Sequence, residues 1–199
     1  MGQETYKNVQ AIVAEDSTAW RQWLEDNHSQ ETAVWLIIFR KESDHASVYY
    51  PQAVDDALCY GWIDSKPNKR DDHSYYQYFS ARNPKSNWSK VNKDKVERLI
   101  AEGLMRPAGF KIIEIAKQNG TWDTLNDVDN LIVPPDLSKL FEANPKAFNY
   151  WKDFPDSTKR GILEWIFNAK RPETRQKRII ETVELAEKNV RANQFIRKT

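Results

Sequence analysis

One short segment of the chain combines cationic, amide, hydroxyl and aromatic side chains. Arg82, Lys85, Asn87, Trp88 and Ser89 lie close together in sequence, directly before a predicted helix. The first amides of a helix attract anions, and a tryptophan ring can stack on a flat group. The segment therefore suits a phosphate, a carboxylate or a stacked base. The alternative is a capped turn in which Trp88 fills the core.

Asp64 lies in a predicted strand, where a carboxylate is costly unless it is paired or faces solvent. One interpretation is an ion pair or hydrogen bond from Asp64 to Arg82, Lys85 or a backbone turn. The other is a recognition pocket in which Arg82 and Lys85 are the cations. The aromatic walls of that pocket would be Trp62, Phe79 and Trp88. A general acid or base would need a second carboxylate opposite Asp64, so no catalytic residue is assigned.

A second group of cations lies near the C-terminus. Arg171, Arg175 and Arg178 are spaced i, i+4 and i+7 on one predicted helical face, next to Lys170. Such a stripe is most often solvated or paired with acidic residues. The alternative is a polyanion-binding face, which with the segment 82–95 would make the protein a nucleic-acid-binding module.

Charge is distributed unevenly along the chain, although the net charge is only +1. Residues 1–59 are acidic, residues 82–118 basic, residues 119–157 acidic and residues 158–199 basic. The simpler interpretation is that acidic and basic segments neutralise each other on the folded surface. The other is an anion-binding face built from the basic segments.

The sequence lacks the motifs of several kinds of metal, cofactor and catalytic site. The three histidines are far apart and no C-x-x-C or H-x-x-x-H spacing occurs, which argues against a metal site. The chain contains six glycines and none of the glycine-rich phosphate or dinucleotide loops, so no cofactor is expected. Cys59 lies at the apolar end of a short predicted helix, and we expect a core residue rather than a nucleophile.

The first 82 residues predict a small antiparallel sheet flanked by helices. Helices are expected over 17–27, where Asp16 or Ser17 is the N-cap, and over 51–60, where Asp55 and Asp56 face water. The continuous apolar run that begins at Val34 predicts a central strand, and residues 62–82 predict a hairpin. Residues 47–49 could add a further strand.

The rest of the chain predicts helices. They are expected over about 90–102, from Pro107 to about residue 116, and over 136–142, 145–152, 156–169 and 172–192. Residues 121–137 form a proline-punctuated segment without periodicity, which indicates a loop, and the domain boundary is expected near 121–134. The sequence thus predicts an α+β protein, with an α+β domain over 1–120 and a helical region over 121–199 packed on it.

The chain has the composition of a folded protein, with 199 residues, 40% hydrophobic and 30% charged. Its longest apolar run, Ala33 to Phe39, is far shorter than the roughly 20 residues of a membrane span, so no membrane insertion is expected. The first residues do not follow the pattern of a secretory signal. We therefore expect a cytoplasmic protein.

Four strings together resemble a known family. They are CYGWIDS (59–65), ARNPKSNWSKVNK (81–93), AEGLMRPAG (101–109) and LEWIFNAKRPETRQKRI (163–179). This ordered set resembles the YdeI/OmpD-associated family of bacterial proteins, also called the bacteriocin-protection family, from about Trp20 to Val190. The resemblance implies protection against bacteriocins or cationic antimicrobial peptides and association with a porin. It implies no catalytic residues, and without a signal peptide we do not extend direct porin contact to this chain.

Three functions remain open at this point. The favoured one is a non-enzymatic stress or envelope-protection factor that acts by binding an anionic ligand or a protein partner. The second is a nucleic-acid or polyanion-binding module that uses the two basic segments. The third is an enzyme on a small anionic substrate centred on Asp64 and Arg82, which would require a concave site around both side chains.

Overall fold

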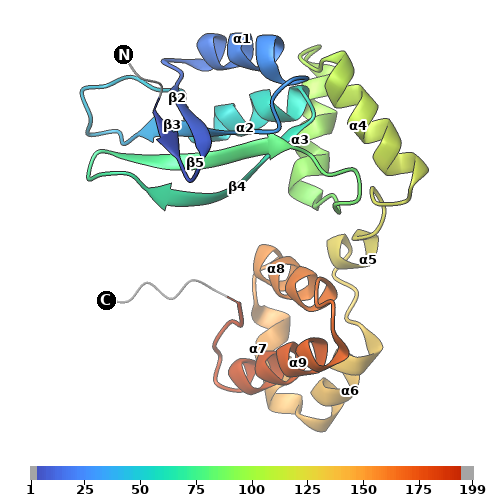
Figure 1. The fold of residues 1–199 in the computed structure, drawn as a ribbon. Coiled ribbons are helices and arrows are strands. Elements are labelled where there is room, and N and C mark those ends of the chain that lie inside the picture. The colour runs from blue at the N-terminus through green and yellow to red at the C-terminus, as the bar shows by residue number, and fades with distance from the viewer. Residues whose placement is uncertain (1–3, 194–199) are drawn as a thin grey trace. The chain divides into compact units, whose positions relative to one another are not determined.

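The structure is a computed structural model that describes residues 4–193, and it confirms the predicted α+β class. The chain divides into two units, one ending at Asp123 and one beginning at Thr124. Every strand of the described residues lies in the first unit, and the second unit is helical (Figure 1).

The first unit contains a five-stranded sheet of order β1-β2-β3-β5-β4. Its strands are β1 (Thr5–Tyr6), β2 (Val9–Val13), β3 (Ala33–Phe39), β4 (Trp62–Lys69) and β5 (Ser74–Ala81). The predicted central strand is β3, and the predicted hairpin is β4 with β5. Pairing between β3 and β5 is the longest in the sheet, running from Ala33 opposite Ser80 to Phe39 opposite Ser74.

The sheet differs from the predicted antiparallel one because β2 runs parallel to β3. A parallel neighbour needs a crossover connection, and α1 (Ser17–Asn27) provides it. The sequence predicted no strand before this helix, so β1 and β2 were not expected. Residues 47–49 form no strand; instead the Val48 amide donates a single hydrogen bond to the carbonyl of Ala14 (2.9 Å).

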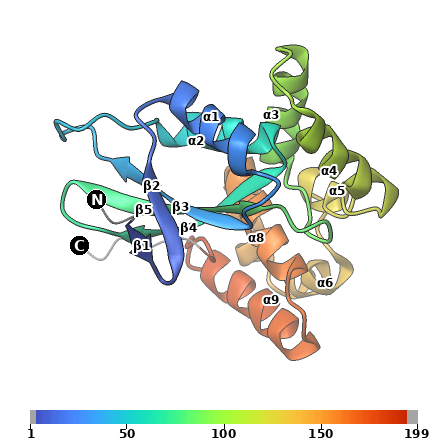
Figure 2. The same ribbon diagram turned by 45° about the horizontal axis from the view of Figure 1, so that its top comes forward.

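Helices α1 and α2 (Tyr50–Cys59) lie over one face of the sheet (Figures 1 and 2). Helix α1 begins where predicted because the Asp16 side chain accepts a hydrogen bond from the Ala19 amide (2.8 Å). Helices α3 (Lys90–Ala101) and α4 (Pro107–Gln118) follow the sheet in the chain. Proline in the first turn of α2 and of α4 fits the helical geometry without losing a hydrogen bond.

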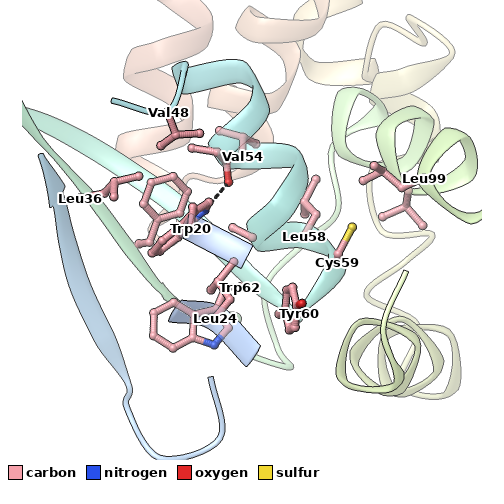
Figure 3. Packing of buried hydrophobic residues seen from close by; sticks show 14 of the residues in the cluster. Trp20, Leu24, Leu36, Val48, Val54, Leu58, Cys59, Tyr60, Trp62 and Leu99 are labelled. Carbon is pink, nitrogen blue, oxygen red and sulfur yellow. Dashed lines mark hydrogen bonds between the residues drawn. The ribbon is translucent and has the colours of Figure 1, made fainter. Parts of the chain in front are cut away.

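The main core of the first unit lies between the helices and the sheet (Figure 3). Trp20 of α1 is fully buried there, and its indole N–H donates to the backbone carbonyl of Ala53 in α2 (3.0 Å). Leu24, Leu36 and Leu58 pack around it from α1, β3 and α2. Burial of such large apolar side chains supplies most of the free energy that holds the helices on the sheet.

The opposite face of the sheet carries a smaller aromatic cluster. The rings of Tyr6 and Tyr76 stack at 4.3 Å, and Trp35 meets the Tyr6 ring edge-on at 5.1 Å. Beside them Arg70 forms a bidentate pair with Glu4, which also accepts from the Tyr76 hydroxyl (2.7 Å). Successive residues of β5 therefore point to different environments, Tyr76 to this cluster and Tyr75 to the helix-covered face.

The second unit packs its own core from α5 (Asn126–Asp129), α6 (Pro135–Ala143), α7 (Pro145–Asp153), α8 (Asp156–Phe167) and α9 (Pro172–Ala186). Phe141, Trp151 and Ile162 are among its buried residues. Two expectations were wrong here. Residues 121–137 contain the short helix α5, and the last helix ends at Ala186 rather than at residue 192.

Among the described residues, no helix has the length and apolarity that crossing a bilayer requires. Within residues 4–193 there is also no cluster of three or more His, Cys, Asp or Glu side chains that could hold a metal ion.

Candidate functional site

The Arg82 turn, residues 82–89, places its arginine inside the protein. Arg82 is 6% exposed, and its guanidinium lies 3.6 Å from the centre of the Trp88 ring. Its Nη2 donates to the carbonyl of Asn87, and its backbone N–H donates to the carbonyl of Gly61 (3.0 Å). Its Nε and Nη1 have no hydrogen-bond acceptor in the part of the chain that the structure describes.

Burial lowers the pKa of Arg82 to about 10, because the charged form is desolvated. No carboxylate among residues 4–193 forms an ion pair with it. Stacking on Trp88 compensates for part of this cost through the cation–π interaction. A buried donor without an acceptor lowers the stability of the fold, and most buried polar groups in proteins are hydrogen-bonded. The two guanidinium nitrogens of Arg82 are therefore unusual.

The predicted aromatic walls belong to the core. Trp62, Phe79 and Trp88 are each 1% exposed or less, so they cannot line an open pocket. The Trp62 indole N–H donates to the carbonyl of His28 (3.2 Å), and Trp88 packs beside Trp122 at 5.0 Å. Burial of a large aromatic ring removes a large apolar surface from water, which favours a position in the core over one in a pocket wall.

The remaining polar residues of the turn have local roles. Ser89 is the N-cap of α3, and its hydroxyl accepts from the Asn92 amide at 3.5 Å. Lys85 is exposed. The turn therefore resembles the capped-turn alternative, with an arginine buried beneath it.

Asp64 contacts neither of the cations proposed for it. Its carboxylate accepts a hydrogen bond from the Tyr50 hydroxyl (2.7 Å). Asp64 is paired with Phe79 across the strands, so both side chains lie on the face covered by α2, where Tyr50 begins the helix. Arg82 lies beyond the end of the strand, which explains why the predicted pairing does not form.

A groove that the sequence did not predict lies beside this Tyr50–Asp64 hydrogen bond. We call it the tyrosine groove, and its volume is about 490 Å³. It is lined by Arg40, Tyr50, Pro67, Asn68, Lys69, Tyr75 and Gln77. These residues come from the end of β3, the start of α2, and the paired strands β4 and β5, all within the first unit.

Strand geometry produces this groove. Tyr75, Gln77 and Phe79 alternate on the helix-covered face of β5, and Phe79 is covered while Tyr75 and Gln77 line the groove. The pairing of β4 with β5 is irregular between Asp64 and Pro67, which displaces the outer strand at this point. The Gln77 amide nitrogen donates to the carbonyl of Ser65 in the irregular segment.

The groove is lined by two cations, Arg40 and Lys69, and the Asp64 carboxylate is hydrogen-bonded to the lining residue Tyr50. Arg40 is exposed and forms no ion pair with the described residues, and no Asp or Glu lines the groove. Lys69 pairs with Asp72 (2.7 Å), but both side chains are largely exposed, so solvent screens that pair. Burial raises the pKa of Tyr75, and the nearby charge of Arg40 opposes that shift.

The C-terminal cations are partly engaged within the second unit. Arg175 forms a bidentate pair with Asp136 (2.7 and 2.9 Å). Arg178 stacks on the Trp165 ring at 4.9 Å and donates to its backbone carbonyl. Lys170 and Arg171 are exposed. The segments 82–95 and 170–178 belong to different units.

Asp55 and Asp56 do not face water as the helix pattern predicted. Asp56 is buried and accepts from Ser17 (2.6 Å) and Arg21 (2.9 Å), while Asp55 pairs with Lys95 and Arg98. Burial raises the pKa of Asp56, and those hydrogen bonds partly oppose the shift. The reason is that α1 and α3 both pack against α2, so that its polar side meets two other helices.

Cys59 is a free thiol in the core of the first unit. Burial raises its pKa, although a hydrogen bond with Arg21 acts in the opposite direction. A buried thiol of raised pKa has the character of a packing residue.

The fold and its sites define a two-unit α+β protein with a cationic groove in the first unit and a helical second unit. Residues 12–112 match a family model described as a domain of unknown function, DUF8412, over just over half of the chain. The chain therefore belongs to that family. Residues 130–189 match the model described as "Bacteriocin-protection, YdeI or OmpD-Associated", which confirms the resemblance for the C-terminal part. No curated protein and no solved structure matches the chain.

Proposed function

We propose that this chain is a binding protein and that its tyrosine groove binds an anionic ligand. One observation carries the proposal: Arg40 and Lys69 line a groove of about 490 Å³ that no carboxylate lines. A guanidinium forms strong, charge-assisted hydrogen bonds with carboxylates and phosphates. The groove is open to solvent along its length, and its volume falls in the range of small-molecule sites.

The lining residues favour binding over catalysis. A general acid–base mechanism needs a histidine, a carboxylate or another titratable group that can reach the substrate. Tyr50 donates its hydroxyl to Asp64, and burial together with that hydrogen bond raises the pKa of Tyr50. A tyrosine held in this way is a poor base near neutral pH, and burial raises the pKa of Tyr75 as well. The remaining titratable groups of the lining are the guanidinium of Arg40 and the Lys69 ammonium, which is paired with Asp72, so we assign the groove no reaction.

The family matched by residues 130–189 suggests the biological setting. We propose that ligand binding serves a protective role, as part of a stress or envelope-protection response. The groove belongs to the first unit, whose own family has no assigned function. This role is therefore inferred from the second unit, and the ligand class from the first.

Calorimetric titration with phosphate, acetate, ribose 5-phosphate and a short oligonucleotide tests the proposal. We compare the wild type with Arg40→Gln and with Lys111→Gln, which removes the same charge from an exposed position on α4. Losing a charged hydrogen bond is worth about 1.5–3 kcal/mol, so Arg40→Gln should weaken anion binding at least tenfold, whereas Lys111→Gln should not. Equal affinities in all three proteins would contradict the proposal. Binding of the oligonucleotide alone, with a steep salt dependence, would favour the polyanion-binding alternative.

A second candidate site is the Arg82 turn, and the unpartnered Nε and Nη1 of Arg82 favour it. An anion that reached these nitrogens would supply the missing acceptors, with Lys85 and the first turn of α3 nearby in sequence. Because the nitrogens are buried, binding requires the turn to open. Anion-dependent thermal stabilisation that persists in Arg40→Gln and disappears in Arg82→Met would identify this site. The opposite pattern would assign binding to the groove.

A further inference from the structure

The walls of the tyrosine groove add a requirement for the shape of its ligand. We infer, on the basis of the proposed function, that the ligand is an aromatic anion. Its planar ring would lie against Tyr50 and Tyr75, and its carboxylate or phosphate would reach Arg40.

Tyr50 offers its ring rather than its hydroxyl. The hydroxyl donates to Asp64 at 2.7 Å, which fixes the ring and occupies the polar end of the side chain. The ring belongs to the first residue of α2 and packs against the main core. A ring that is fixed in the free protein loses little conformational entropy when a ligand stacks on it.

Tyr75 is held by the sheet. It is paired with Ile38 of β3 on one side and with Lys69 of β4 on the other, so its backbone is fixed between two strands. Its side chain is half-buried and packs against the main core while it also lines the groove. Tyr50 and Tyr75 therefore present aromatic surface from a helix and from the sheet to the same space.

Gln77 also lines the groove, and 2% of its surface is exposed. Its amide nitrogen donates to the carbonyl of Ser65, which fixes the orientation of the amide. Pro67 adds an apolar wall on the β4 side. These groups make a pre-organised apolar and aromatic surface with a defined polar position, the usual composition of a small-molecule site.

Arg40 supplies the charge at the end of β3. Its guanidinium is planar and has no ion-pair partner among the described residues, so two of its N–H groups can bind a carboxylate or a phosphate side by side. A compact inorganic anion would satisfy Arg40 but would leave most of the 490 Å³ unfilled. A planar ring attached to the acidic group would cover the tyrosines as well, and stacking on an aromatic side chain adds affinity.

Two matched pairs of ligands test the inference. Benzoate and cyclohexanecarboxylate have the same charge and similar size, but only benzoate has an aromatic face. Adenosine monophosphate and ribose 5-phosphate share a phosphate and a sugar, but only the nucleotide carries a base. Titration should show the aromatic member of at least one pair binding about fivefold tighter or better, since stacking of one base on an aromatic side chain is worth that much. The pair that responds distinguishes a carboxylate from a phosphate ligand.

Variants of Tyr75 identify the contact. Tyr75→Phe keeps the ring and should keep the preference for the aromatic ligand, while Tyr75→Leu should reduce the ratio of affinities toward one. Tyr78→Leu, on the opposite face of the same strand, is the matched control and should keep the full preference. Far-ultraviolet circular dichroism checks that each variant is folded. If Tyr75→Leu does not fold, Tyr75→Met, which also lacks a ring but has a longer side chain, takes its place and should likewise reduce the ratio of affinities toward one.

The outcomes separate this inference from the proposed function. Equal binding of both members of each pair, with loss of binding in Arg40→Gln, overturns the aromatic requirement and leaves anion binding in place. A preference that survives in Tyr75→Leu overturns the assigned contact. No binding of any of the four anions contradicts the proposed function, and with it this inference.

Discussion

Gly109 should be the least replaceable glycine of the first unit. It lies in the first turn of α4, against the end of α2. A Cβ added there would lie 2.4 Å from the carbonyl oxygen of Cys59 and 2.6 Å from the Cε of Met105. The same carbonyl accepts a hydrogen bond from the Arg106 amide (3.1 Å). A methyl group at this position therefore forces two backbone segments apart at a hydrogen bond that joins them.

The expected magnitude comes from two opposing effects. Alanine is favoured over glycine inside a helix by about 1 kcal/mol. To restore even 3.0 Å between the new Cβ and the Cys59 oxygen, the two segments must separate by about 0.6 Å, the difference between 3.0 and 2.4 Å. Overpacking of this kind costs typically about 1–3 kcal/mol and can cost more where rigid backbone must move. Because the closest atoms are backbone, the cost lies at the upper end of that range, and after the gain from alanine we expect Gly109→Ala to lower the free energy of unfolding of the first unit by about 2 kcal/mol.

The same substitution elsewhere in the chain provides the control. Gly161 lies within α8, and a Cβ built there meets no atom within 4 Å. Gly161→Ala should therefore stabilise the second unit by about 0.5–1 kcal/mol through helix propensity alone. Scanning calorimetry measures both variants, with a shift of roughly 4 °C for each kcal/mol in units of this size. If Gly109→Ala unfolds at or above the temperature of the wild type, α4 does not pack on the Cys59 carbonyl as described.

Three further predictions concern stability and reactivity. Asp16→Ala removes the acceptor for the Ala19 amide and should lower the free energy of unfolding by about 1 kcal/mol in urea denaturation, while Asp16→Ser should recover most of the loss. Hydrogen bonds from Arg175 hold the pKa of Asp136 below its usual value. The ionised carboxylate therefore stabilises the fold at pH values above the pKa that Asp136 has in the unfolded chain. This contribution is lost as the pH falls through the lower pKa that Asp136 has in the folded protein. Arg175→Met should therefore lose less stability than the wild type between pH 7 and pH 3; an equal loss would show that the pair contributes nothing. Cys59 should react with Ellman's reagent only as fast as the protein unfolds, and rapid reaction in plain buffer would show that the thiol is accessible.

Helices were predicted well because their signals are local. The cap at Asp16 and the apolar spacing of Trp20 and Leu24 lie within one helix, and α1 spans Ser17–Asn27 as expected. Residues 121–137 were predicted as a loop, because the four residues of α5 are too few to show a helical period. Strand β2 was missed for a related reason. It has only five residues and no flanking turn signal, so the sequence does not show that it pairs in parallel with β3.

The candidate site is formed by residues that are far apart in the sequence, so the sequence did not predict it. Arg40 follows an apolar strand and Tyr50 is the first residue of a helix, and neither position contains a motif. They become neighbours of Tyr75 only when β3 pairs with β5 and α2 packs on the sheet. The Arg82 segment, by contrast, is dense in functional side chains along the sequence, but the burial of Trp62 and Trp88 depends on packing that composition does not reveal.

The order of the strands has a consequence for synthesis of the protein on the ribosome. Strand β5 lies between β3 and β4 in the sheet but follows both in the chain, so β4 has no partner strand until β5 has emerged. Until then the AVWLIIF segment of β3 presents an unpaired edge that is apolar and uncharged. Segments of this kind pair readily with other chains, so translation that pauses before residue 74 should expose the nascent protein to aggregation and to binding by chaperones.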